Sequence, residues 1–112
     1  MKLVHYEDVK SEDVEQGSSK VNVRWLITKK TGADNFFMRL FEIEPEGFTP
    51  HHTHLWEHEI FILEGEGNII SEGKEIRFTA GDAIFIPSNE KHQFRNNSKK
   101  QVKMLCLIPN VE

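Results

Sequence analysis

The sequence predicts an all-β domain, folded as a sandwich or a barrel. Two observations support this prediction. No stretch of about ten or more residues has helical periodicity, and short apolar runs alternate with turn-forming residues about every 8–12 positions. A chain of 112 residues is expected to form one domain. Its core would bury about two thirds of the surface that the unfolded chain exposes.

The expected strands follow a polar start. Residues 1–19 are expected to form a lead-in or dimerisation arm, which leaves 20–112 for the barrel domain. The runs expected to form strands are VNVRWLIT (21–28), FFMRLFEIE (36–44), EIFILEGEG (59–67), NIIS (68–71), EIRFTAGDAIFIPSNE (75–90), HQFRN (92–96) and VKMLCLIP (102–109). In EIFIL (59–63) apolar residues fall on both faces, which is typical of a strand buried on both sides. We therefore expect a homodimer.

Charge and composition argue against several classes of partner. The net charge is -4, from 14 Lys and Arg against 18 Asp and Glu, which does not favour nucleic-acid binding. No apolar stretch approaches the ~18 residues of a membrane span, and the first residues lack the apolar core of a signal peptide. Cys106 is the only cysteine, so no internal disulfide is expected. These features predict a cytoplasmic protein with a small-molecule partner.

Histidines are concentrated in HHTHLWEHEIFILEG (51–65), which holds four of the six in the chain. His52 and His54 would point to the same side of a strand. On a straight strand His58 would lie about 20 Å from His52, too far for one metal ion. A shared metal therefore requires the chain to reverse near residues 55–57. After a reversal, strand parity does not choose between His58 and Glu59 as a ligand.

A second cluster lies in GDAIFIPSNEKHQFRN (81–96). A turn is expected at Gly81 and Asp82, followed by a strand that ends at Pro87, because proline cannot donate to the ladder. Asn89 suits a left-handed turn position. His92 would begin the next strand, with Phe94 on the same face.

These two stretches resemble the two motifs of the cupin superfamily of small β-barrels. The matching positions are Gly47, His52, His54, His58 and Gly65 in the first motif, and Gly81, Pro87, Asn89, His92 and Asn96 in the second. The spacing from Gly47 to His52 is one residue short, and Asn89 replaces a glycine. His58 stands where the family usually has Glu. The resemblance implies a single-domain cupin β-barrel, also described as a double-stranded β-helix or jelly roll.

The resemblance also implies one divalent metal ion held by His52, His54, His58 and His92, with Glu59 as the alternative to His58. This version of the motif is similar to a small subgroup of cupins that bind manganese through four histidines, some of them oxidative enzymes. Mn²⁺ is therefore the metal implied, whereas imidazole ligands also suit Fe, Ni, Cu or Zn and affinity alone favours Cu. Four ligands leave an octahedral ion open positions, which is typical of a catalytic metal.

Residues on the same strand faces as the ligands are candidates for a substrate pocket. An arginine at position 39 that faced the barrel would need an anionic partner, such as a substrate carboxylate, and otherwise would point to solvent. Cys106 is either a functional thiol or a small core residue. Arg39 and Cys106 are thus the candidate catalytic residues. The pocket candidates are Arg39, Trp56, Phe94, Met104, Cys106 and Ile108.

Three functions fit these features. The first hypothesis is a metal-dependent oxidoreductase, dioxygenase-like or peroxide-using, that acts on a small and partly apolar molecule. The second is a non-catalytic cupin that binds or senses a small ligand. The third is an isomerase or lyase in which the metal acts as a Lewis acid. A fold alone does not choose among them.

Overall fold

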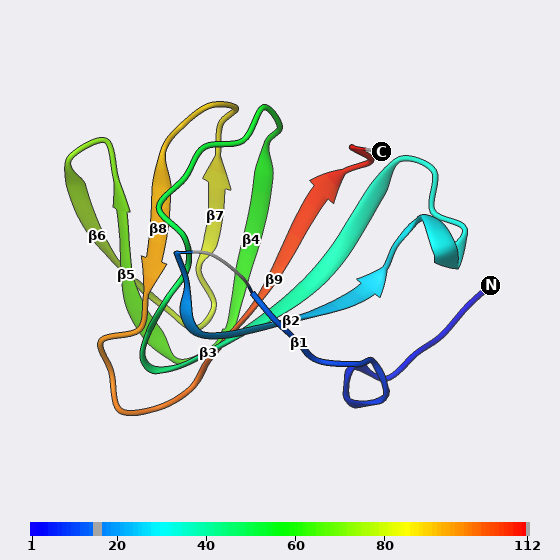
Figure 1. Cartoon of the computed structure of the whole chain (residues 1–112), viewed down its shortest axis with the longest axis horizontal. Coiled ribbons are helices and arrows are strands. Elements are labelled where there is room, and N and C mark those ends of the chain that lie inside the picture. The colour runs from blue at the N-terminus through cyan, green and yellow to red at the C-terminus, as the bar shows by residue number, and fades with distance from the viewer. Residues whose placement is uncertain (15–16, 112) are drawn as a thin grey trace.

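Nine β-strands form one strongly curved sheet in the computed structural model, which describes residues 1–14 and 17–111 (Figure 1). No helix in these two segments is long and apolar enough to cross a membrane. Two short 3₁₀ helices are present, η1 (Tyr6–Asp8) and η2 (Lys29–Thr31). The strands are β1 (Glu12–Asp13), β2 (Ser19–Ile27), β3 (Phe36–Phe48), β4 (His58–Glu64), β5 (Glu66–Ser71), β6 (Lys74–Thr79), β7 (Ala83–Ile86), β8 (His92–Arg95) and β9 (Val102–Pro109).

Strand β3 is the central element of the sheet. It is 13 residues long and pairs with β2, β8 and β9. The hydrogen-bonded order is β6-β5-β8-β3-β9-β4-β7, with β2 on β3 and β1 on β2, and every pairing is antiparallel. The sheet curls around its inner face as a half-barrel (Figure 1). The all-β fold predicted from the sequence is confirmed.

Side-chain alternation along the strands forms the core. On β9 every second residue points inward and is buried, from Val102 to Ile108. On β4 the inward residues are His58, Ile60 and Ile62. The outward residues of β4 include Phe61, which is 44% exposed. The two apolar faces predicted for this strand are therefore present, and the outer one is partly exposed among the described residues.

Two backbone positions in the predicted motifs have a clear steric role. Asn89 has φ +67°, the left-handed conformation expected from its place in the turn after Pro87. At Gly47 a Cβ atom would lie 2.8 Å from the carbonyl oxygen of Ser19 and 2.9 Å from that of Lys20. A side chain would push β2 away from β3. Glycine thus permits the close approach of the two strands that form one wall of the barrel.

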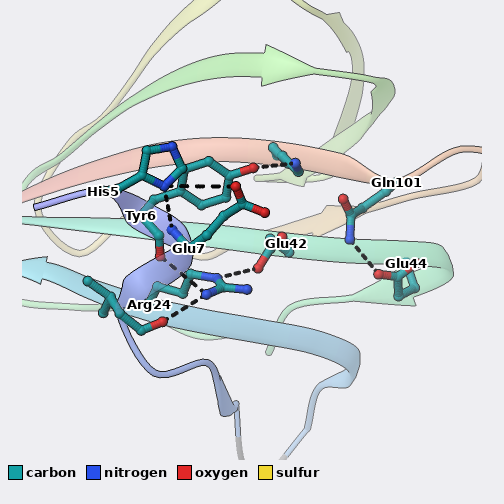
Figure 2. Close-up of polar contacts among 9 residues, drawn as sticks. His5, Tyr6, Glu7, Arg24, Glu42, Glu44 and Gln101 are labelled. Carbon is teal, nitrogen blue, oxygen red and sulfur yellow. Dashed lines mark hydrogen bonds and ion pairs between the residues drawn. The ribbon is translucent and has the colours of Figure 1, made fainter.

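The first residues are anchored to the sheet by Arg24 of β2 (Figure 2). Its Nη1 donates to the carbonyl oxygens of Tyr6 (3.2 Å) and Val9 (2.8 Å), and its Nε donates to Glu42 Oε1 (2.8 Å). Lys103 Nζ donates to the Tyr6 hydroxyl at 3.1 Å. The described part of the predicted arm therefore packs on its own barrel. Its contact with a second subunit stays a prediction.

Candidate metal centre

Three histidine rings converge on the inner face of the barrel. Ring nitrogens of His52, His54 and His92 all lie within 4.8 Å of one another. His52 and His92 form an antiparallel bridge with two backbone hydrogen bonds, of 3.2 and 3.1 Å. Directly opposed residues of an antiparallel pair point to the same face, so this bridge sets the two rings side by side. The backbone N–H of Asn89 donates to the His54 carbonyl at 2.7 Å and holds that residue in place.

His58, at the first position of β4, lies beside this cluster but is not one of the three residues whose ring nitrogens converge. The chain bends at Leu55 and Trp56, so the reversal expected near residues 55–57 is present. As a result the His58 ring centroid lies 4.7 Å from that of His54 and 5.3 Å from that of His92. His58 is 5% exposed, and its Nε2 is buried without a hydrogen-bond partner. A buried nitrogen without a partner is costly, and a metal ion would satisfy it.

Glu59 lies on the opposite side of β4 and is exposed. It is paired with Phe85 of β7 on the outer surface of the sheet. Alternation along a strand places adjacent side chains on opposite faces, so one of the two residues points inward and the other outward. The inward donor is the imidazole. His58 as the fourth ligand stays a prediction that this geometry supports.

Burial keeps the four rings neutral near pH 7. The pKa of His58 is lowered from 6.5 to about 3 by burial and then by the nearby charge of Arg39. Burial also lowers the pKa of His54, to about 4, with a further contribution from His52. The pKa values of His52 and His92 are lowered mainly by burial, although a hydrogen bond to the Glu90 carbonyl partly opposes the shift at His92. Neutral imidazoles are the form that binds metals.

A largely apolar cavity of about 200 Å³ opens beside the histidines. This volume is below the ~300–1,000 Å³ of typical drug-sized sites, so the cavity suits a small molecule or one end of a larger one. Its walls come from β2, β3, β4, β8, β9 and the segment before His52. The lining residues are Val14, Val23, Trp25, Arg39, Phe41, Thr49, Pro50, His52, His54, His58, Ile60, His92, Phe94, Met104 and Cys106.

Strand register sets the residues around Arg39. Trp25 on β2, Arg39 on β3, Cys106 on β9 and Ile60 on β4 form one row of directly paired positions. Arg39 Nη2 donates to Cys106 Sγ at 2.9 Å, and that sulfur lies 3.5 Å from His58 Nδ1. Burial raises the pKa of the Cys106 thiol, and the Arg39 charge opposes this shift. The thiol thus links the arginine to the candidate fourth ligand.

The other predicted pocket residues separate into two groups. Phe94 and Met104 line the cavity together with Arg39 and Cys106. Trp56 and Ile108 are not among its described lining residues. Trp56 stacks on His54, with ring centroids 4.8 Å apart, and Ile108 is 3% exposed in the core.

Several lining residues were not identified from the sequence. Trp25 and Val23 on β2 and Phe41 on β3 belong to this group. The alternation in VNVRWLIT (21–28) places Val23 and Trp25 on one face, and Phe41 shares the parity of Arg39. This periodicity identifies an inward face, but it does not show which cavity the face lines.

Three imidazoles, those of His52, His54 and His92, fit a divalent transition metal, and His58 stays the predicted fourth ligand. The three are neutral and converge, and beside them the buried His58 Nε2 has no hydrogen-bond partner. All-nitrogen donor sets suit Mn, Fe, Ni, Cu and Zn.

Comparisons with known proteins identify the family. The family model described as the cupin domain matches residues 39–108. The chain belongs to the cupin family. Its fold superposes on the solved structure of the polyketide cyclase RemF from Streptomyces resistomycificus with a TM-score of 0.92 and 41% identity, covering 97% of this cupin and 79% of that chain.

Two curated proteins are also similar to this cupin. The oxalate-binding protein of Thermotoga maritima is 30% identical over 95 residues, which are 82% of this cupin and 78% of that protein. The polyketide synthase CurC of Streptomyces cyaneus is 28% identical over 86 residues, 75% of this cupin and 56% of that protein. This cupin therefore spans just over half the length of the latter.

The choice between His58 and Glu59 can be tested by metal analysis. We expect His58→Ala to lower the metal content of the purified cupin at limiting metal by at least about tenfold, because it removes an inward donor. Glu59→Ala, the matched control on the outer face, should keep the metal content of the parent. Plasma mass spectrometry measures both. The reverse pattern, with metal lost only in Glu59→Ala, would contradict this ligand assignment.

The lowered histidine pKa values predict how stability depends on pH. The unfolded chain binds protons at a pKa of 6.5, whereas His54 and His58 in the folded chain do so at about 4 and about 3. The stability of the metal-free cupin is therefore full above about pH 7 and falls as the pH drops. Thermal melting between about pH 7 and pH 5 isolates the histidine contribution, because ordinary carboxyl groups stay ionised there.

Two variants test the origin of this slope. His54→Gln and His58→Gln should each reduce it, because each variant removes one histidine whose pKa is lowered in the folded chain. A melting temperature of the metal-free parent that does not change over this range would show that the rings titrate normally.

Proposed function

We propose that this cupin is a metal-dependent enzyme that closes a ring on a small, oxygen-rich and partly aromatic substrate. The observation that carries the proposal is the convergence of neutral histidine rings at an apolar cavity open to small molecules. The similarity to a polyketide cyclase, at 41% identity over 97% of this chain, supports ring closure over other metal-assisted reactions. The partial similarity to a polyketide synthase protein points to the same class of molecule.

Each part of the site has a role in such a reaction. A divalent ion held by His52, His54, His58 and His92 would act as a Lewis acid towards a substrate carbonyl. The apolar walls, which include Phe41, Phe94 and Met104, would exclude water and hold the substrate chain folded, so that its two reacting carbons lie close together.

Arg39 and the backbone pairing of His52 with His92 would have further roles in this reaction. The Arg39 guanidinium would donate to an oxygen on which negative charge develops. Backbone pairing between His52 and His92 would keep the imidazoles fixed while substrate enters. Ring closure by aldol condensation joins two carbons of one molecule and releases water, so it requires no oxidant or reductant.

The donor set favours a second candidate, a metal-dependent oxidoreductase. All-imidazole ligation suits redox-active Mn, Fe and Cu, and the four-histidine motif resembles that of manganese cupins with oxidative activity. For this reason Mn²⁺ is proposed as the first metal to test, beside Zn²⁺. A third candidate, ligand binding without turnover, is favoured by the similarity to an oxalate-binding protein.

One experiment distinguishes these three functions. The cupin loaded with Zn²⁺ or with Mn²⁺ is incubated with a synthetic linear poly-β-ketone that carries an aromatic ring, with mass spectrometry and an oxygen electrode as readouts. Ring closure predicts a product lighter by one water, formed with either metal and without oxygen uptake. Oxygen uptake with Mn²⁺ but not with Zn²⁺ would support the oxidoreductase. Saturable binding without any product would support the binding protein.

Variants link the activity to the histidine cluster. His52→Ala should lower kcat/KM by at least about a hundredfold, because Lewis-acid stabilisation amounts to several kcal/mol and each 1.36 kcal/mol is about tenfold in rate. His51→Ala, at the exposed adjacent position, should stay within about twofold of the parent. Equal activity in both variants would remove the metal centre from the reaction.

We also propose a homodimer that covers the outer face of β4. Phe61 and Leu63 on β4 and Phe85 on the paired β7 are 44%, 42% and 55% exposed, an apolar group that a second subunit would shield. Light scattering should give twice the 13.1 kDa of one chain. Phe61→Glu should give monomers, whereas Ile76→Glu, at an exposed apolar position on β6, should stay dimeric. A parent of 13.1 kDa at working concentration would contradict this proposal.

A further inference from the structure

We propose that Arg39 is the anion-binding residue of the cavity, and that the molecule bound there joins a negatively charged oxygen, a carboxylate or an enolate, to an aromatic body. This inference rests on the proposed function, because it names the class of molecule that would bind in the same cavity.

The Arg39 guanidinium is held between aromatic rings. Its central carbon lies 5.2 Å from the Trp25 ring centroid and 4.9 Å from the Phe41 ring centroid. Contacts of this kind stabilise a cation and fix its orientation, but they leave the N–H groups at the edge of the guanidinium free to donate. The cation is therefore placed at the cavity wall beside apolar surface.

The hydrogen-bond donors of Arg39 are poorly satisfied. Nη2 donates to the sulfur of Cys106, which is a weak acceptor, and Nε is buried without a partner. Within residues 1–14 and 17–111, Arg39 forms no ion pair, whereas Arg24 pairs with Glu42 and Arg77 with Glu66. A partly buried cation without a counter-ion is unfavourable unless a ligand supplies the negative charge.

Among the described residues that line the cavity with Arg39, none carries a carboxylate. The titratable side chains that share the cavity lining are His52, His54, His58, His92 and Cys106. A divalent ion on the histidines would make the cavity still more positive.

Charge and shape together define the ligand. A positive group recessed in low-dielectric walls attracts anions strongly. A fully polar anion would leave the walls formed by Phe41, Phe94 and Met104 without apolar contacts. A planar aromatic anion satisfies the requirements of both charge and shape. Its ring would lie against these side chains, and its charged oxygen would accept from Arg39. The planar guanidinium of Arg39 suits a carboxylate or enolate oxygen better than the ammonium group of a lysine would.

Benzoate and benzamide are the probes that test this inference. They have the same shape, and only benzoate carries a negative charge. Calorimetric titration of the purified cupin should show that benzoate binds at least tenfold more tightly than benzamide, a difference of about 1.4 kcal/mol. Arg39→Met should abolish this difference, and Arg39→Lys should restore part of it.

Arg95→Met is the matched control. Arg95 is also an arginine stacked on an aromatic ring, with its central carbon 5.7 Å from the Phe48 ring centroid, but it is exposed and lies outside the cavity lining. This variant should keep the full preference for benzoate. If Arg39→Met does not fold, as judged by thermal melting, the two probes are compared on the parent and on Arg39→Lys instead. A smaller preference for benzoate in Arg39→Lys than in the parent would support the inference, and an equal preference would contradict it.

Metal content, measured on the same samples, separates this inference from the proposed function. Loss of the benzoate preference in Arg39→Met at unchanged metal content supports the inference. Equal affinity of the parent for the two probes, or a preference that survives in Arg39→Met, overturns it, even if the metal and ring closure are both found. An Arg39-dependent preference in protein that holds no metal would support the inference and remove the metal-dependent function.

Discussion

Backbone pairing between His52 and His92 is the constraint on which the candidate metal centre depends. Two hydrogen bonds join these residues although 40 positions separate them in the chain, and they direct both rings to one face. Thr49 reinforces the pairing, because its hydroxyl accepts from the Phe94 N–H at 2.8 Å and its carbonyl accepts from Gln93 at 2.9 Å. These two imidazoles are thus positioned by backbone pairing between segments far apart in the chain.

Buried polar atoms without hydrogen-bond partners are found at this same site. Among the described residues, the buried side-chain nitrogens that lack a hydrogen-bond partner are Arg39 Nε, Trp56 Nε1 and His58 Nε2, all near the histidines. Each such group costs about 1–3 kcal/mol relative to a satisfied one. Core residues such as Ile43 and Ile62, both 0% exposed, offset this cost elsewhere in the barrel. Unsatisfied donors in one small region are the pattern expected of a binding site.

Local signals in the sequence predicted local features well. The positive φ of Asn89, the end of β7 before Pro87 and the chain reversal after His54 each follow from the residue types at those positions. The surroundings of Arg39 could not be predicted in the same way, because they depend on register between strands far apart in the chain. Nothing in the spacing of residues 21–28 states that Trp25 lies opposite Arg39, or that Cys106 lies on its other side. Local turns are encoded locally, whereas neighbours across strands depend on the packing of the whole barrel.

The imidazole at position 58 has a consequence for how this site could change in evolution. The backbone that carries His58 is fixed by β4 pairing with β7 and β9, independently of the side chain present. A change to a carboxylate, the residue that the cupin motif usually carries at this place, would add one negative charge to the centre and lower the net charge of a bound divalent ion and its ligands by one unit. Replacement of the one residue at position 58 would therefore change the chemistry of the site without a change of fold.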